Sequence, residues 1–195
     1  MQTSERTAFG SFVADLHELF ATVTDGRQQA DRVVARLEIL LREPGWLESM
    51  IDVPAPEDYR FRNFLLHRDE LGFPAGGSGC MVLAHSVPPW QASPIHDHGP
   101  CWVVYGIYQG RAQLRRYRVA PEAGLSAAFR LEETERVSLD AGQALAFYPG
   151  DAHDIRSIAP DKRLILRITS QDLSQVEKYN YDPHVYTRRP AAGGD

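Results

Sequence analysis

The sequence predicts a mainly β fold, an antiparallel barrel or sandwich preceded by α-helices. Two observations predict it. Up to about residue 50, apolar residues recur at helical spacing, and from Tyr59 onward short strand-like runs alternate with turn residues. The length of 195 residues is enough for one domain with a helical extension and a full hydrophobic core.

The N-terminal part of the chain predicts two amphipathic helices. Apolar residues recur at i, i+3, i+4 and i+7 over residues 7–24 and again over residues 27–42. Asp25 lies between the two segments and can cap the second helix, while Pro44-Gly45 ends it. We expect residues 1–55 to form a helical segment packed on the barrel.

The middle of the chain predicts a series of short strands that build a barrel over residues 56–175. Clusters of Gly, Pro and Asp separate them and supply the turns. The expected strands are 60–67, 80–85, 94–98, 102–109, 112–117, 128–131, 136–139, 144–148, 154–157 and 164–169. Residues 176–195 are expected to form a C-terminal tail that begins polar and ends disordered.

Composition narrows the class of protein. A formal charge of -5 argues against nonspecific binding to nucleic acid or membranes. The N-terminus lacks the features of a signal peptide, and no apolar run approaches the roughly 20 residues that span a bilayer. With two cysteines there is no disulfide framework. We expect a cytoplasmic protein, a monomer or weak homo-oligomer, that binds neither nucleic acid nor membrane.

Three histidines form a candidate metal site. His96 and His98 are two residues apart in a predicted strand, so their side chains project from the same face and can reach one ion. His153 follows the tight turn at Pro149-Gly150 and is the third candidate ligand. Three imidazoles with open coordination positions are typical of catalytic sites, whereas structural zinc sites are closed four-ligand cages. The alternative is that His96 and His98 are ordinary surface residues at a strand end.

These motifs resemble those of the cupin superfamily. The matching positions are His96, His98, Gly110, Gly142, Pro149, Gly150 and His153. Val103 stands where most cupins have a glutamate ligand, so the metal site resembles a three-histidine one. That ligand set and the P-x-H-D-H-G stretch are similar to the cysteine dioxygenase-like family of thiol dioxygenases. The resemblance covers residues 59–170 and implies a cupin-type double-stranded β-helix, or jelly-roll barrel, that holds Fe(2+).

The resemblance also implies an anchor for the substrate carboxylate. The family has a tyrosine and an Arg-Asn pair near the first barrel strand, and Tyr59 and Arg62-Asn63 match them with one extra residue between. Arg62 is therefore expected to bind the substrate and take part in catalysis, with Arg60 as a competitor for the role. The alternative for Arg62 is a solvated arginine on an edge strand.

The last predicted strand departs from the family. Family members place Ser, His and Tyr at alternate positions here, and this chain has Ile165, Arg167 and Thr169. If that face lines the barrel, Arg167 is a buried cation that needs an anionic partner, which the substrate can supply. The alternatives are that Arg167 faces solvent or pairs with an acid such as Asp154. The departure puts cysteine itself in doubt as the substrate.

Four further residues are candidates around the pocket. His85 on a predicted strand is expected to line it, and Trp102 and Tyr105 to wall it, with core packing as the alternative for both aromatic residues. Asp97 lies between two ligands and should point away from the metal, toward turn hydrogen bonds.

The function expected from the resemblance is oxidation of a small carboxylated thiol, such as cysteine or 3-mercaptopropionate, to its sulfinate with O2. One alternative is another three-histidine activity, either a dioxygenase acting on a diketone or enediol or a lyase. A second alternative is a non-enzymatic cupin that binds a metal or a small anion. An anion anchor in the pocket discriminates between the first two, because a neutral diketone does not need one.

Overall fold

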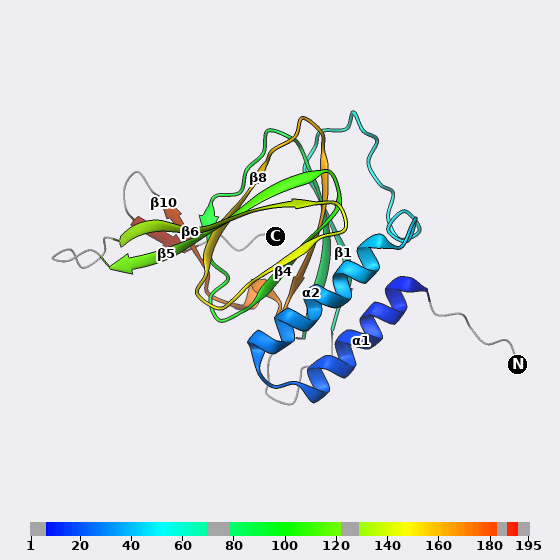
Figure 1. Ribbon diagram of the computed structural model, residues 1–195, viewed down its shortest axis with the longest axis horizontal. Helices are drawn as coiled ribbons and strands as arrows, with labels where there is room; N and C mark the ends of the chain where they lie inside the picture. Colours follow the sequence, from blue (N-terminus) through cyan, green and yellow to red (C-terminus); the bar gives the residue numbers. More distant parts are fainter. Residues whose placement is uncertain (1–6, 70–78, 122–128, 183–186, 191–195) are drawn as a thin grey trace, which may run out of the picture.

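The computed structural model describes residues 7–69, 79–121, 129–182 and 187–190. Two antiparallel sheets face each other, and two helices cover the outside of one of them (Figure 1). This arrangement confirms the expected fold class, a mainly β cupin-type double-stranded β-helix preceded by α-helices.

The two helices form where the periodicity predicts them. Helix α1 covers Ala8–Thr22 and α2 covers Gly26–Arg42. The Asp25 side chain caps α2 by accepting a hydrogen bond from the Gln28 N–H at 2.8 Å, as expected from the sequence. Neither helix in the described part of the chain is long and apolar enough to span a membrane.

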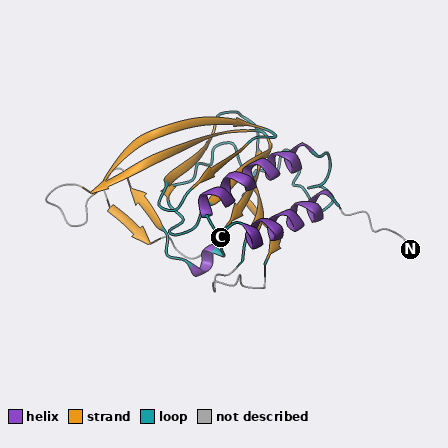
Figure 2. Cartoon of the chain, turned by 60° about the horizontal axis from the view of Figure 1, so that its bottom comes forward, coloured by secondary structure: helices purple, strands orange, loops and turns teal. Residues whose placement is uncertain are grey.

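Eleven strands are present among the described residues. They are β1 Arg62–Arg68, β2 Met81–Val87, β3 Ile95–His96, β4 Val103–Gln109, β5 Arg111–Pro121, β6 Phe129–Asp140, β7 Ala144–Phe147, β8 Ala152–Ser157, β9 Arg163–Thr169, β10 Tyr179–Asp182 and β11 Thr187–Pro190. One sheet has the order β1-β2-β9-β4-β7, and the other has the order β11-β10-β3-β8-β5-β6. Figure 2 shows the two helices side by side on one side of the strands, and α2 contacts β4 and β7 of the first sheet.

Strands β2 and β9, in the middle of the sheet β1-β2-β9-β4-β7, are buried on both faces. On β9, Leu164, Leu166 and Ile168 pack with the apolar stripes of the helices, while Ile165 on the opposite face belongs to the core between the two sheets. Every residue of β2 and of β9 is buried as a result. Where α2 crosses β4, a Cβ added to Gly106 would lie 2.7 Å from the Leu37 side chain, so a larger residue here would force the leucines of α2 to shift.

Two parts of the expected strand pattern were wrong. Strands were expected separately over 128–131 and 136–139, but residues 129–131 and 136–139 belong to the single strand β6, and residue 128 lies outside the described residues. The acidic residues between them form ion pairs with arginines of the neighbouring strand β5, as Glu135 does with Arg116 at 2.9 Å. Strand β6 is at the edge of its sheet, where polar side chains can be solvated. Cross-strand ion pairs thus continue a strand that apolar alternation does not predict.

The other difference lies after residue 175, where the sequence predicted a tail. Strand β10 pairs with β3 in the register Asn180↔His96 and Tyr181↔Ile95. Tyr181 is buried with Ile95 and Phe129, which explains the pairing. The segment taken for a tail therefore supplies a strand beside the candidate metal site.

Candidate metal centre

The three predicted ligands come together at the β3–β8 pair. His96 and His153 are direct partners in the register of these strands, and His98 follows β3 in the next loop. One ligand nitrogen from each ring lies within 4.8 Å of the others, and the ring centroids are 4.6 to 5.1 Å apart. The three rings converge as the spacing predicts, but β3 ends at His96, so His98 reaches the cluster from the loop and not from the strand expected over 94–98.

The turn before β8 positions His153. Gly150 adopts a φ of 82°, a left-handed conformation that suits glycine. The Asp151 N–H donates to the Tyr148 carbonyl at 2.9 Å, and the Asp151 carboxylate accepts from the Tyr148 N–H at 2.8 Å. The carboxylate is also paired with Arg116. This closed turn fixes the point at which β8 begins, and so the position of the third imidazole.

Backbone carbonyls orient two of the rings. His96 Nδ1 donates to the Pro94 carbonyl at 2.9 Å, and His153 Nδ1 donates to the Asp151 carbonyl at 3.2 Å. A proton on Nδ1 leaves the Nε2 lone pair available to a metal, which is the usual arrangement behind a ligating histidine. His153 Nε2 and His98 Nδ1 are buried and have no hydrogen-bond partner among the described residues.

The cluster holds its imidazoles neutral. Burial first, and then the neighbouring His153 and His96, hold the pKa of His98 well below its usual 6.5. Burial and then His96 do the same to the pKa of His153, and burial lowers the pKa of His96. Neutral imidazoles with unused nitrogens fit a borderline divalent cation such as iron, zinc or nickel. The chemistry of the donor set thus fits the metal implied by the resemblance.

Asp97 points away from the cluster, as alternation predicts. Its carboxylate accepts hydrogen bonds from the Gly99 N–H at 3.0 Å, the Tyr179 N–H at 3.1 Å and the Tyr181 hydroxyl. These bonds tie the loop that carries His98 to β10, so the segment after residue 175 helps to position the ligands.

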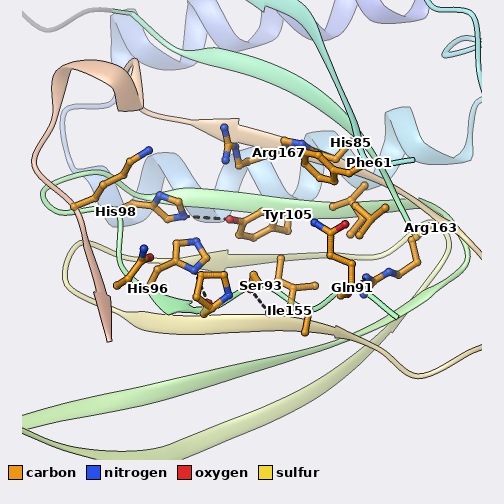
Figure 3. A pocket seen from close by; sticks show the side chains of 16 residues that line it. Phe61, His85, Gln91, Ser93, His96, His98, Tyr105, Ile155, Arg163 and Arg167 are labelled. Atoms are coloured by element: carbon orange, nitrogen blue, oxygen red, sulfur yellow. Dashed lines mark hydrogen bonds between the residues drawn. The ribbon is translucent and has the colours of Figure 1, made fainter. Parts of the chain in front are cut away.

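A cavity of about 320 Å³ opens beside the histidines. His96 and His98 line it at one end (Figure 3), whereas His153 is not among the lining residues and has no exposed surface. Tyr105 projects into the cavity with its hydroxyl 3.1 Å from His98 Nε2. The candidate site thus combines a three-nitrogen ligand set with room for a small molecule.

Two of the other predicted residues lie in this cavity. His85 lines it, and its Nδ1 makes a hydrogen bond to the Asn63 side chain. Arg167 is 7% exposed and also lines it, across the sheet register from Tyr105. Asp154 pairs with Arg115 and Arg156, so it is not the acid suggested for Arg167.

The predicted substrate anchor near the first strand lies elsewhere. Arg62 does not line the cavity but pairs with Asp58 at 2.8 Å, with its side chain 40% exposed. Arg60 pairs with the same carboxylate at 2.9 Å, and hydrogen bonds from Arg60 and then Arg62 hold the pKa of Asp58 well below its usual range. Tyr59 is exposed and packs on Trp90, with ring centroids 5.2 Å apart. The alternative of a solvated arginine therefore describes Arg62 better.

Trp102 also lies outside the cavity. It is 2% exposed, donates to the Gln29 side chain at 3.2 Å and stacks on Phe20. The residues of β4 alternate, so Tyr105 faces the cavity while Trp102, an odd number of positions away, faces the helices. Core packing, the alternative considered for this residue, is what the structure shows.

Sequence reasoning missed several cavity residues. Arg163 lies one residue before the last expected strand, 164–169, and lines the cavity; the alternation R-x-I-x-R over 163–167 is the signal that could have found it. Lys178 and Asn180 line the cavity from β10 and the residue before it, in the stretch taken for a tail.

Comparison with known proteins supports no finer assignment. No protein-family model matches the sequence. No curated protein is significantly similar to it. Similar solved structures include TT1209 from Thermus thermophilus, with 18% identity, TM-score 0.44, and alignment over 64% of this chain and 93% of that one. Others are a double-stranded β-helix protein from Klebsiella pneumoniae, with 13% identity, TM-score 0.43 and coverage of 64% and 81%, and a cupin superfamily protein from Desulfitobacterium hafniense, with 14% identity, TM-score 0.41 and coverage of 62% and 84%. At these values the chemistry has to be argued from the site.

Proposed function

We propose that this chain is an iron(II)-dependent thiol dioxygenase that converts a small carboxylated thiol to its sulfinate. The observation that carries the proposal is the convergence of three neutral imidazoles at the end of a cavity that is also lined by buried Arg167. The other proposed partners are O2 and no macromolecule, in a cytoplasmic protein that is a monomer or weak homo-oligomer.

His96, His98 and His153 would hold the iron. Iron(II) held there would supply the redox chemistry between a thiolate and O2, because three protein ligands do not fill its coordination sphere. The unused buried nitrogens of His98 and His153 support this assignment, since a buried imidazole nitrogen with no partner is costly unless a ligand satisfies it.

The overall reaction balances without a further co-reactant. A thiolate and O2 give a sulfinate: both oxygen atoms end on sulfur, the S–H proton is released when the thiolate forms, and sulfur loses the four electrons that reduce O2. No protein group has to be oxidised or reduced over the cycle. The chain therefore needs only to bind the thiol as its anion, hold it beside the open positions and exclude bulk water.

The cavity residues meet these needs. Arg167 offers a carboxylate a planar fork of N–H donors, which lysine cannot reproduce. The Tyr105 hydroxyl lies next to His98 and can donate a hydrogen bond to a ligand held by the histidines. Apolar Ile155 and Ile165 line the cavity and limit water around the reacting atoms.

The cationic lining favours a thiol acid over the alternative substrates. A neutral diketone has no negative group for the Arg167 guanidinium to bind, whereas the carboxylate of a thiol acid can accept hydrogen bonds from it. The Ser, His and Tyr of the family's last strand are Ile165, Arg167 and Thr169 here, so the assistance to oxygen chemistry differs. We therefore propose a thiol acid other than cysteine as the preferred substrate.

Metal analysis followed by oxygen-uptake assays tests this function. The protein reconstituted with iron(II) is given cysteine, 3-mercaptopropionate, mercaptosuccinate or a diketone, with the zinc-loaded protein as a control that has metal but no redox chemistry. We expect one O2 consumed per sulfinate formed, with iron only. Uptake with the diketone alone, or product formation without O2, would reject the proposal in favour of another three-histidine activity. Metal binding without turnover of any of them would favour a non-enzymatic cupin.

A further inference from the structure

Arg163 is a buried cation at the end of the cavity remote from the histidines. It is 1% exposed, and its only polar contacts within the described part of the chain are from Nη2 to the Gln91 carbonyl at 2.6 Å and, more weakly, to the Pro88 carbonyl at 3.5 Å. Nε and Nη1 are buried without a hydrogen-bond partner among the described residues. Burial lowers the pKa of Arg163 to about 10, so the group is still a cation at neutral pH. Such a charge is unfavourable unless an anion reaches it.

The distance between Arg163 and the histidines indicates how long a ligand must be to reach both. Arg163, Ile165 and Arg167 alternate along one face of β9, and all three line the cavity. Arg167 is level with Tyr105 and so with the histidine end, and Arg163 lies four residues farther along, which is roughly 13 Å in a strand. Figure 3 shows His96 and His98 at one end and Arg163 at the other.

The wall between these two ends is largely apolar. Val87, Ile155 and Ile165 line it, so a ligand that reaches from the histidines to Arg163 passes apolar side chains on the way. The three parts of the cavity are thus a metal-binding end, an apolar section and a buried guanidinium. A molecule complementary to them has a metal-binding group and an anion separated by a hydrocarbon chain.

We infer that Arg163 binds the terminal carboxylate of the substrate, and that the preferred substrate is a thiol whose carboxylate is separated from sulfur by a longer apolar chain than in cysteine or 3-mercaptopropionate. This inference rests on the proposed function for the thiol group but not for the anion. Arg167 remains the anchor for the carboxylate of short thiol acids. Arg167 thus binds the carboxylate of short thiol acids and Arg163 that of longer ones.

A matched pair of substrates tests the inference. The iron-loaded protein and the Arg163→Met and Arg163→Lys variants are assayed with 6-mercaptohexanoate and with the neutral 6-mercaptohexanol. We expect the unmodified protein to favour the acid by at least about tenfold in kcat/KM, mainly through KM. Arg163→Met should abolish that preference, because it lowers kcat/KM for the acid far more than kcat/KM for the alcohol. Arg163→Lys should restore part of it. An unchanged acid-to-alcohol ratio in Arg163→Met, or an equal loss with both thiols, would overturn the inference and leave Arg163 a structural role in the loop at Gln91.

A binding experiment separates this inference from the proposed function. Hexanoate and hexanol are titrated calorimetrically into the zinc-loaded protein, where no oxygen chemistry occurs. If no thiol is oxidised but hexanoate binds at least about tenfold more weakly to Arg163→Met, the dioxygenase proposal fails and the anion site stands. If hexanoate binds no better than hexanol to the unmodified protein, the anion site is rejected whatever the thiol assays show.

A second cluster of metal-binding side chains joins α1 to β1, outside the cavity. His17 Nε2 and His67 Nε2 lie 2.7 Å and 3.0 Å from the same Asp69 carboxylate oxygen. The three ligand atoms lie within 4.8 Å of one another, and two imidazoles with one carboxylate form a donor set that zinc accepts at about 2.0–2.2 Å. Asp69 has 11% and His67 22% of its side chain exposed, so both are already held in place.

From this geometry we also infer a zinc site formed by His17, His67 and Asp69 that fastens α1 to the barrel. His17 has 51% of its side chain exposed, which leaves solvent access for a fourth ligand. The histidine-carboxylate hydrogen bonds account for the cluster without metal, so the test has to be retention of zinc and not proximity of the residues.

Zinc content after dialysis against a chelator of micromolar affinity tests the second site. We expect the full chain to retain two zinc ions, and His17→Gln and His153→Ala to lose one each, at different sites. Glu18→Gln, on the same exposed turn of α1, is the matched control and should retain both. Zinc should raise the Tm of His153→Ala but not of a variant that also carries His17→Gln. Equal zinc retention in the His17→Gln variant and the unmodified protein would overturn this site.

Discussion

The two faces of β9 serve different purposes. On the face toward the helices, Leu164 and Leu166 are almost completely buried in apolar surroundings. On the opposite face, Arg163 and Arg167 are nearly as buried but line the cavity. Burying a leucine stabilises the fold, whereas burying an arginine has a cost that a ligand can offset. One strand therefore shows, within seven residues, which positions maintain the barrel and which are available for chemistry.

The largest effect is expected on the helix-facing side. Leu166→Ala removes a side chain with no exposed surface, so it should lower the free energy of unfolding by about 2–5 kcal/mol. Urea denaturation measures the loss. The amount of metal bound per folded molecule should not change. If Leu166→Ala lost metal but kept its stability, the two faces of β9 would not have separate roles.

The cavity face should show the reverse behaviour. Arg167→Met is expected to lower kcat/KM for 3-mercaptopropionate by about 30-fold to 100-fold, because a charge-assisted anchor is lost. The free energy of unfolding should change less than in Leu166→Ala, since an apolar side chain replaces a buried cation. Activity with the neutral thiol 2-mercaptoethanol is the control. Equal losses with both thiols would contradict an anchoring role.

The histidines on the cavity side predict a pH dependence for the metal-free protein. The pKa values of His98 and His153 lie below 6.5 in the fold, so the unfolded chain binds protons that the folded chain does not. Stability contributed by these groups is complete above about pH 6.5 and is lost as the pH falls below it. Thermal unfolding between about pH 7.5 and pH 5 measures this, with His153→Gln expected to show a shallower decline. A decline of the same steepness in that variant would contradict the assignment.

The smallest effect is expected where the resemblance placed the anchor. Arg62 pairs with Asp58 outside the cavity, so Arg62→Gln should leave kcat/KM within about twofold and change stability little. Parallel assays of this variant and Arg167→Met compare the two positions directly. If Arg62→Gln lowered kcat/KM as much as Arg167→Met does, the carboxylate anchor would be Arg62 on the first strand, as the resemblance implied.

Much of the fold could be predicted because local periodicity decides it. The helical stripes of α1 and α2 and the alternation on β9 are properties of short stretches, and the structure follows them closely. Strand β10 could not be predicted because its pairing with β3 depends on contacts such as that of Tyr181 with Phe129, far apart in sequence. The full length of β6 could not be predicted either, because ion pairs to β5, such as that between Glu135 and Arg116, stabilise its polar middle part.

The site was predictable to a similar degree. The three histidines were found because two short sequence motifs contain them, one at β3 and one at its partner β8. Arg62 was misplaced because a motif match does not say whether a nearby acid, here Asp58, takes the side chain away from the cavity. Arg163 was missed because β9 begins at Arg163, one residue before the start that the sequence predicted.

A crystal structure of the iron-loaded protein, prepared without oxygen and measured at the iron absorption edge, tests the central claim most directly. We expect one anomalous peak at about 2.0–2.2 Å from a nitrogen of each of His96, His98 and His153, with its remaining positions facing the cavity. The claim is contradicted if no peak lies among these rings, or if other protein side chains complete the coordination and leave no place for a thiol and O2.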